Sequence, residues 1–348
     1  MFCQRALAKI SRSLTRCTTR PALGSLQGVL RSLWQVSRAS STQGTLHELK
    51  TRGLVELSGR DTVDFLQGLV TSDVAALEGD VTSQYSMMLN VQGRVLYDLL
   101  LYRHPDSAMS GQSDQPRLLL ECDRTVLDEM LKVIRKYKIR KKVNIRPVDE
   151  EWRLFAVVMD VEQRGVTVGV PDPRVPTFGR RVLHPADKPD LEVEGMELES
   201  ETEYHRRRYM WGISEGVSDL PPGNCFPLES NLVFHQGVSF QKGCYVGQEL
   251  TARTHHTGVT RKRLMPLVFD RDGAPIETGT NITRDDGKNV GKFRNSVGKY
   301  GLGLIRMADV KGQLSVANTG GEAVPVITNP PLWWPHEAQI QWKTERGK

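Results

Sequence analysis

One stretch of the sequence surrounds a cysteine with residues that favour its reaction. It runs Phe240-Gln241-Lys242-Gly243-Cys244-Tyr245-Val246-Gly247-Gln248-Glu249. Gly243 has no Cβ, so the backbone can turn tightly there and leave the sulfur uncrowded. Lys242 places a cation nearby, which favours the thiolate over the thiol. The stretch therefore predicts a reactive or metal-binding thiol at Cys244, against the alternative of a small cysteine buried in the core.

The residues after the cysteine predict a bend followed by a helix. Gly247 allows the bend, and the run from Gln248 to Arg253 can begin the helix. A thiol close to a helix N-terminus lies near the positive end of the helix dipole, which again favours the thiolate. The predicted site is therefore Cys244 together with its neighbours Lys242, Gly243, Tyr245, Gly247, Gln248 and Glu249.

The other cysteines are few. Cys3 and Cys17 fall in the N-terminal segment, which leaves Cys122 and Cys225 beside Cys244 in the rest of the chain. This odd, sparse set gives no disulfide framework and contains no C-x-x-C pair. It fits a reducing compartment. Cys122 ends a strand-like run, Leu118–Cys122, and we expect it to pack inside a sheet.

The N-terminal segment has the composition of a targeting sequence. The first 47 residues contain seven Lys or Arg residues and no acid, with leucine and serine between them. This pattern predicts a mitochondrial transit peptide over residues 1–40, with an unstructured basic tail as the alternative. Without those seven cations, 40 basic residues face 41 acidic ones, so the body is nearly neutral and a nucleic-acid partner is not expected. No apolar run reaches the ~18–20 residues of a membrane span.

The body reads as an α+β fold in consecutive parts. Strand-like runs followed by a helix occur twice, over residues 46–150 and again over 151–261. From residue 262 to about 328, short strand-like runs alternate with glycine turns, which predicts a small β-barrel. The tail to residue 335 contains Pro330–Pro335. We expect this segment to pack back on the body, with an exposed partner site as the alternative.

Several of these motifs resemble a known family. Lys242–Glu249 is similar to the K-G-C-Y-x-G-Q-E signature of the folate-binding, tRNA-modification-associated relatives of aminomethyltransferase. Gly212–Gly216 and Pro227–Asn231 resemble the segment that precedes the signature, and Leu89–Arg94 with Asp98 resembles the family's L-N-x-x-G-R run. With a transit peptide, the chain most resembles the mitochondrial iron–sulfur cluster assembly factors of this family.

The resemblance implies both a fold and a function. The fold is an aminomethyltransferase-like ring of two ferredoxin-like α+β parts and a C-terminal β-barrel around a folate-sized channel. The function is late maturation of [4Fe–4S] proteins in the mitochondrial matrix, with A-type iron–sulfur carrier proteins as partners. Aconitase and lipoate synthase are the implied clients, and heme biosynthesis is an implied context. No catalytic residue is assigned, because the resemblance implies an assembly factor rather than an enzyme.

The number of cysteines predicts how this chain would bind an iron–sulfur cluster. A protein-bound cluster normally needs about four thiolate ligands or close substitutes. The mature chain offers three cysteines, one of which is expected in a sheet. We therefore expect Cys244 to supply one ligand of a [2Fe–2S] cluster that is shared with a carrier protein.

Two other functions fit parts of the sequence. The first is a tetrahydrofolate-dependent one-carbon transferase in which Asp98 contacts the folate. Tyr97-Asp98 stands where the glycine-cleavage aminomethyltransferase has two aspartates, so one carboxylate for acid–base help is missing. The second is a zinc site formed by Cys244, His255 and His256, for which no fourth ligand is evident. The basic residues Arg253 and Arg261–Arg263 are expected to hold the loop or an acidic partner.

Overall fold

The computed structural model describes residues 44–105, 115–159, 168–273 and 275–347, which belong to one compact unit. The predicted transit peptide, residues 1–40, lies outside the described residues. No helix in the described part of the chain is long and apolar enough to cross a membrane.

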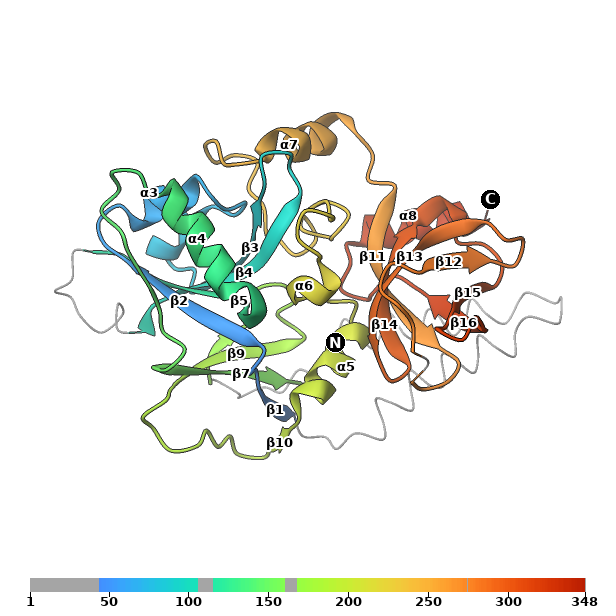
Figure 1. The fold of residues 1–348 in the computed structure, drawn as a ribbon, viewed down its shortest axis with the longest axis horizontal. Helices are drawn as coiled ribbons and strands as arrows, with labels where there is room; N and C mark the ends of the chain where they lie inside the picture. The colour runs from blue at the N-terminus through green and yellow to red at the C-terminus, as the bar shows by residue number, and fades with distance from the viewer. Residues whose placement is uncertain (1–43, 106–114, 160–167, 274, 348) are drawn as a thin grey trace. The chain divides into compact units, whose positions relative to one another are not determined.

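The first sheet contains five strands and includes a hairpin that turns at Asn90–Gly93. Its strand order is β3 (Ser83–Leu89), β4 (Val95–Arg103), β5 (Arg117–Asp123), β2 (Arg52–Ser58) and β6 (Asn144–Pro147), all pairs antiparallel. Cys122 on β5 is 0% exposed, as expected for a core residue. Helix α4 (Leu127–Tyr137) lies across one face of this sheet (Figure 1), which it contacts through Met130, Leu131 and Ile134.

The second sheet takes its first strand from the start of the body. Its order is β10 (Glu197–Glu199), β1 (Thr45–Glu48), β7 (Trp152–Val158), β9 (Gly179–Pro185) and β8 (Val170–Pro171). Residue 150 therefore does not divide the two sheets as predicted, because β1 pairs with β7 and β10 rather than with its sequence neighbour β2. The Thr45–Glu48 segment is too short for its alternating pattern to indicate which sheet it joins.

Helices connect and flank these sheets. Besides α4, the α-helices of this part are α3 (Thr62–Gln67), α5 (Glu201–Met210), α6 (Gly216–Asp219) and α7 (Gln248–Thr257), and the short 3₁₀ segments are η2 (Val74–Glu78) and η4 (Arg124–Val126). Ser200 caps α5, because its side chain accepts a hydrogen bond from the Glu203 amide. Asp61, at the N-cap of α3, makes no side-chain cap bond and accepts a hydrogen bond from the backbone N–H of Lys142.

The C-terminal part is a closed β-barrel, as the glycine spacing predicts. Its strands, in spatial order, are β11 (Lys262–Phe269), β14 (Tyr300–Arg306), β13 (Asn289–Val297), β12 (Asn281–Arg284), β15 (Leu314–Ala317) and β16 (Ala323–Thr328), and η5 (Met307–Asp309) follows β14. Pairing of β16 with β11 closes the barrel. Helix α8 (His336–Gly347) ends the described chain.

The proline- and tryptophan-containing tail packs back on the body, as expected. The indole Nε1 of Trp333 donates to the carbonyl of Trp211 at 2.7 Å. Its ring stacks on His235 with centroids 4.5 Å apart. Trp334 is buried in the barrel core cluster. These contacts join the tail to the end of α5 and to the barrel, so the tail is an anchor rather than a free segment.

Candidate functional site: an exposed cysteine loop

Cys244 lies in an irregular loop that leads directly into α7. The helix begins at Gln248, as predicted, and Gly247 at its N-cap has a left-handed backbone with φ of 78°. Cys244 and Gly243 are exposed, whereas Tyr245 is buried. The thiol therefore stands outward, one residue away from a buried side chain.

The cysteine loop is hydrogen-bonded to the segment Gly68–Ser72, which precedes β3 in the sequence. Val246 N–H donates to the Gly68 carbonyl at 3.1 Å, and Ser239 N–H donates to the Thr71 carbonyl at 3.0 Å. The Thr71 hydroxyl also donates to the Gly237 carbonyl at 2.7 Å. These bonds hold the loop on both sides of Cys244. Nothing local in the sequence indicates these partners, which lie more than 160 residues away along the chain.

Lys242 also holds the cysteine loop against the segment Gly68–Ser72. Its ammonium donates to the carbonyls of Val70 at 2.7 Å and Ser72 at 2.6 Å, and it lies 5.1 Å from the centroid of the Tyr245 ring. Burial lowers the pKa of Lys242 to about 8, although Asp73 opposes the shift. Lys242 makes no hydrogen bond to Cys244 in the described structure. Its observed contacts anchor the loop, and the predicted effect on the thiolate stays a prediction.

The other predicted neighbours of Cys244 have distinct structural roles. The Gln248 side chain accepts a hydrogen bond from the Tyr245 amide at 3.1 Å, which closes the turn before α7. Glu249 is an exposed acid in the first turn of α7, where the helix dipole favours negative charge. Tyr245 packs in the core beneath the first sheet, and burial raises its pKa to about 12.

Gly243 and Gly247 lie before and after the cysteine, and they differ in whether the surrounding structure leaves room for a side chain. A Cβ on Gly247 would lie 2.3 Å from the carbonyl oxygen of Asn90, so no side chain fits there. A Cβ on Gly243 would meet nothing within 4 Å, and its backbone is outside the left-handed region. The tight turn expected at Gly243 is therefore not what the backbone shows, because the turn is made at Gly247. Gly243 only leaves the surroundings of Cys244 open.

Cys244 is the only exposed cysteine in the described part of the chain. Cys122 is 0% exposed and Cys225 is 4% exposed. Burial raises the pKa of both Cys122 and Cys225, which disfavours their thiolates. In the described part of the chain, Cys244 is therefore the one cysteine whose thiolate is available to bind a metal ion.

The paired histidines lie on α7 and contact an aromatic ring. Phe240 stacks on His255 with ring centroids 3.7 Å apart and an interplanar angle of 7°, and His256 meets the same ring edge-on. This contact packs the loop entrance against the helix. No group of three His, Cys, Asp or Glu side chains in the described residues is placed to hold a metal ion. The zinc alternative with Cys244, His255 and His256 is therefore not supported.

Asp98 lies in a buried cluster of charges that joins the two sheets. Its carboxylate accepts from the Gly216 amide at 3.0 Å and from Arg52 at 3.4 Å. Burial raises the pKa of Asp98, although Arg52 opposes the shift. The buried charge cluster consists of Arg52, Asp98, Glu121, Asp172, Arg174, Arg181, Arg208, Glu215 and Asp219.

The surroundings of Asp98 do not fit a folate ring as they stand. Asp98 is 3% exposed and each of its oxygens has a partner. The hydroxyl of Tyr85 and Nη1 of Arg52 are buried without hydrogen-bond partners among the described residues. A pterin that contacted the Asp98 carboxylate would have to separate it from Arg52 or from the Gly216 amide.

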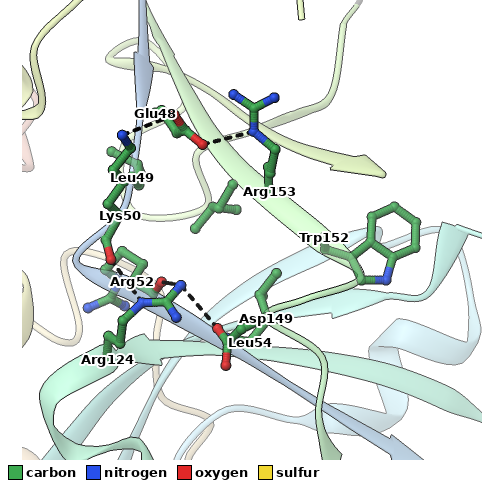
Figure 2. A pocket seen from close by; sticks show the side chains of 10 residues that line it. Glu48, Leu49, Lys50, Arg52, Leu54, Arg124, Asp149, Trp152 and Arg153 are labelled. Carbon is green, nitrogen blue, oxygen red and sulfur yellow. Dashed lines mark hydrogen bonds and ion pairs between the residues drawn. The ribbon is translucent and has the colours of Figure 1, made fainter. Parts of the chain in front are cut away.

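The two pockets described for this structure do not include Cys244 or Asp98. One, with a volume of about 230 Å³, lies beside the turn between β1 and β2 and is rich in cations (Figure 2). In Figure 2, Arg153 pairs with Glu48 at 2.8 Å and Arg124 pairs with Asp149 at 3.2 Å. Glu48 and Asp149 thus compensate Arg153 and Arg124 inside the pocket, and Arg52 is paired with Asp98 and Glu121 of the buried charge cluster.

Comparison with known proteins assigns the fold and the family. A family model described as the CAF17 C-terminal β-barrel domain matches residues 261–336. Among solved structures, the aminomethyltransferase T of the glycine cleavage system from Bartonella henselae matches with a TM-score of 0.64. The match covers 86% of this chain and 88% of that protein at 15% identity, so it shows a shared fold and no more.

Two similar proteins carry a name that bears on function. A Mus musculus protein named iron–sulfur cluster assembly factor IBA57, mitochondrial, is 41% identical over 322 residues, which cover 86% of this chain and 88% of the mouse protein. The Homo sapiens protein of the same name is 40% identical over 308 residues, with 82% and 84% covered. At this identity and coverage, the chain belongs to the IBA57 family of mitochondrial iron–sulfur cluster assembly factors.

Proposed function

We propose that this chain takes part in maturing iron–sulfur proteins in the mitochondrial matrix, with Cys244 as its one ligand to a [2Fe–2S] cluster shared with a carrier protein. The observation that carries the proposal is the contrast between one exposed thiol and two buried ones. Because a cluster needs about four ligands, the remaining ligands have to come from a second protein. An A-type carrier is the partner expected from the family resemblance.

The loop geometry supports a role in presenting the thiol. Bonds from Ser239, Lys242 and Val246 hold the loop against Gly68–Ser72, while Gly243 and Cys244 stay exposed. A ligand held on a fixed backbone loses less conformational entropy when it binds than one on a free loop. Because Cys244 is exposed on a loop that is held in place, its thiol is positioned to bind a cluster that lies between two proteins. Client enzymes such as aconitase and lipoate synthase would receive the completed [4Fe–4S] cluster.

The test is reconstitution with a purified A-type carrier, iron and sulfide under anaerobic conditions. We expect a cluster-dependent heterodimer that elutes with visible absorbance, and we expect Cys244→Ser to abolish it. Cys225→Ala is the matched control, because it removes a thiol that is buried. Gln241→Ala changes an exposed side chain of the same loop and should also leave the complex intact. Formation of an equally stable coloured complex by Cys244→Ser would show that the ligand assignment is wrong.

Folate-dependent one-carbon transfer is the alternative, with Asp98 as the folate contact. Titration with tetrahydrofolate tests it directly. Saturable binding that Asp98→Asn abolishes would favour the transferase, provided that the thermal unfolding of this buried variant shows a folded protein. Absence of binding by the wild-type chain would eliminate it, in keeping with the engaged carboxylate of Asp98.

A further inference from the structure

Arg263 is a largely buried cation without an anionic partner. It lies on β11, and its guanidinium carbon stands 3.9 Å from the centroid of the Phe234 ring and 5.7 Å from that of Trp334. Its Nη1 donates to the Leu228 carbonyl at 3.2 Å and to the Asn231 amide oxygen at 3.4 Å. Within the described residues, Nε and Nη2 donate to no acceptor and no carboxylate pairs with Arg263.

This arrangement is costly for the protein alone. Removing a cation from water is unfavourable unless an anion compensates it. Burial accordingly lowers the pKa of Arg263 to about 10, with no opposing charge. The aromatic contacts offset only part of the cost, since a cation–π contact contributes about 0.5–2 kcal/mol. Trp334 adds a second unmet donor, because its indole Nε1 is buried without a hydrogen-bond partner in the described structure.

Arg263 lines a pocket of about 220 Å³ between β11 and the start of α8. Phe234, Met307 and Ala338 give it apolar walls, and Thr260, Glu337 and Gln341 add polar groups. Drug-sized ligands occupy pockets of roughly 300–1,000 Å³, so this one suits a smaller molecule. Unlike the pocket of Figure 2, whose arginines are paired with carboxylates, it retains an unneutralised guanidinium.

Glu337 restricts the class of ligand. It lines the same pocket from the first turn of α8, yet neither Glu337 nor Arg263 takes part in an ion pair with any described residue. A dianion such as phosphate would be repelled by Glu337. A small molecule that has a carboxylate for Arg263 and an amine for Glu337 satisfies both charges, because a guanidinium binds a carboxylate through two parallel hydrogen bonds.

We propose that the pocket formed by Phe234, Arg263 and Glu337 binds a small zwitterionic amino acid, with its carboxylate at Arg263 and its ammonium at Glu337. The site contains neither Cys244 nor Asp98, so it does not depend on the function proposed above. Bound ligand would bridge the first barrel strand and the C-terminal helix, and would therefore also stabilise the position of the tail.

The test is titration calorimetry of the full chain with glycine, L-alanine and L-serine, and with acetate, methylamine and inorganic phosphate for comparison. We expect saturable binding of at least one amino acid, and at least tenfold weaker binding of acetate, methylamine and phosphate. Arg263→Gln should weaken amino-acid binding at least tenfold. Arg261→Gln is the matched control, because it removes an exposed cation two residues away and should change nothing.

A second variant keeps the test informative if Arg263→Gln lowers the folding stability. Glu337 is exposed, so Glu337→Gln should fold normally. It should weaken binding of the amino acid and strengthen binding of acetate, because only the ammonium group loses its partner. The proposal is overturned if no amino acid binds the wild-type chain, if Arg263→Gln binds as tightly as wild type, or if Glu337→Gln affects amino acid and acetate alike.

Discussion

Gly93 and Gly247 lie in van der Waals contact although 154 positions separate them in the sequence. A Cβ on Gly247 would come within 3.2 Å of the Gly93 Cα, and a Cβ on Gly93 would come within 2.9 Å of the Gly247 carbonyl oxygen. Both residues have a left-handed backbone. The turn between β3 and β4 thereby lies beside the start of α7, the helix that follows the cysteine loop (Figure 1).

This contact predicts different effects of alanine at three glycines. Gly247→Ala and Gly93→Ala should each lower the unfolding free energy by at least about 1–3 kcal/mol, because each forces a side chain into a left-handed backbone and against its neighbour. Gly243→Ala should change it by less than about 0.5 kcal/mol, since its Cβ would meet open space. Urea unfolding of the three variants measures the difference. Equal losses at Gly243 and Gly247 would contradict the loop geometry described here.

The burial of the cysteines predicts which of them can be alkylated. Brief treatment of the native full chain with iodoacetamide should label Cys244 quickly, because its side chain is exposed. Cys122 and Cys225 should be labelled only when the protein opens, since both are buried. Mass spectrometry of the peptides separates these sites from Cys3 and Cys17. Rapid native labelling of Cys225 would show that a second thiol is available to a cluster.

The contacts of Lys242 predict a titration within the physiological range. Its side chain should titrate near pH 8 instead of near 10.5, because burial disfavours the ammonium. Since the folded-state pKa is the lower one, the protonated amine costs stability below pH 8, and this cost is relieved as the pH rises from 8 toward 10.5. NMR of ¹³C-labelled lysine, assigned with Lys242→Arg, gives the midpoint. A midpoint near 10.5 would contradict the burial of the amine.

The unfolding free energy should show the same effect of Lys242. We expect the difference between wild type and Lys242→Met to shift in favour of wild type across pH 8 to 10.5, because only the wild type loses the cost of a buried ammonium there. Urea unfolding at several pH values measures it. A difference that does not change with pH would mean that Lys242 is as solvated in the folded state as in the unfolded chain.

The buried charge cluster predicts a large effect at Glu215. Burial alone would raise the pKa of Glu215, but Arg181 and Arg174 outweigh it and hold the pKa well below its ordinary value. Glu215→Gln should therefore cost about 3–5 kcal/mol at pH 7, as expected when one partner of a buried ion pair is removed. The contribution is present above the unfolded pKa and is lost as the pH falls through the folded pKa. Glu249→Gln, at an exposed carboxylate, is the control.

Trp333 should determine how firmly the tail is held. Trp333→Phe keeps a ring against His235 but removes the hydrogen bond to the Trp211 carbonyl, so a loss of about 0.5–1.5 kcal/mol is expected. Trp333→Ala removes both contacts and should cost more, about 3 kcal/mol. Thermal unfolding and limited proteolysis after residue 329 measure the two effects. Identical stability of the two variants would show that only the hydrogen bond, and not the stacked ring, holds the tail.

The sequence alone determined the features that depend on neighbouring residues. The hairpin at Asn90–Gly93, the start of α7 at Gln248, the barrel from Lys262 and the prominence of Cys244 all follow from local spacing, turn chemistry and cysteine count. These patterns reach over ten to twenty residues, which is the range within which hydrophobic period and glycine placement act.

Tertiary structure decided which groups lie opposite one another. The sequence could not show that Lys242 bonds to Val70 and Ser72, or that Asp98 is paired with Arg52, because sheet order brings these residues together across long separations. Strand β1 joins the second sheet for the same reason. Local pattern therefore identified the thiol, whereas the packing of distant segments decided that its loop is held in place and that it is the one exposed cysteine among the described residues.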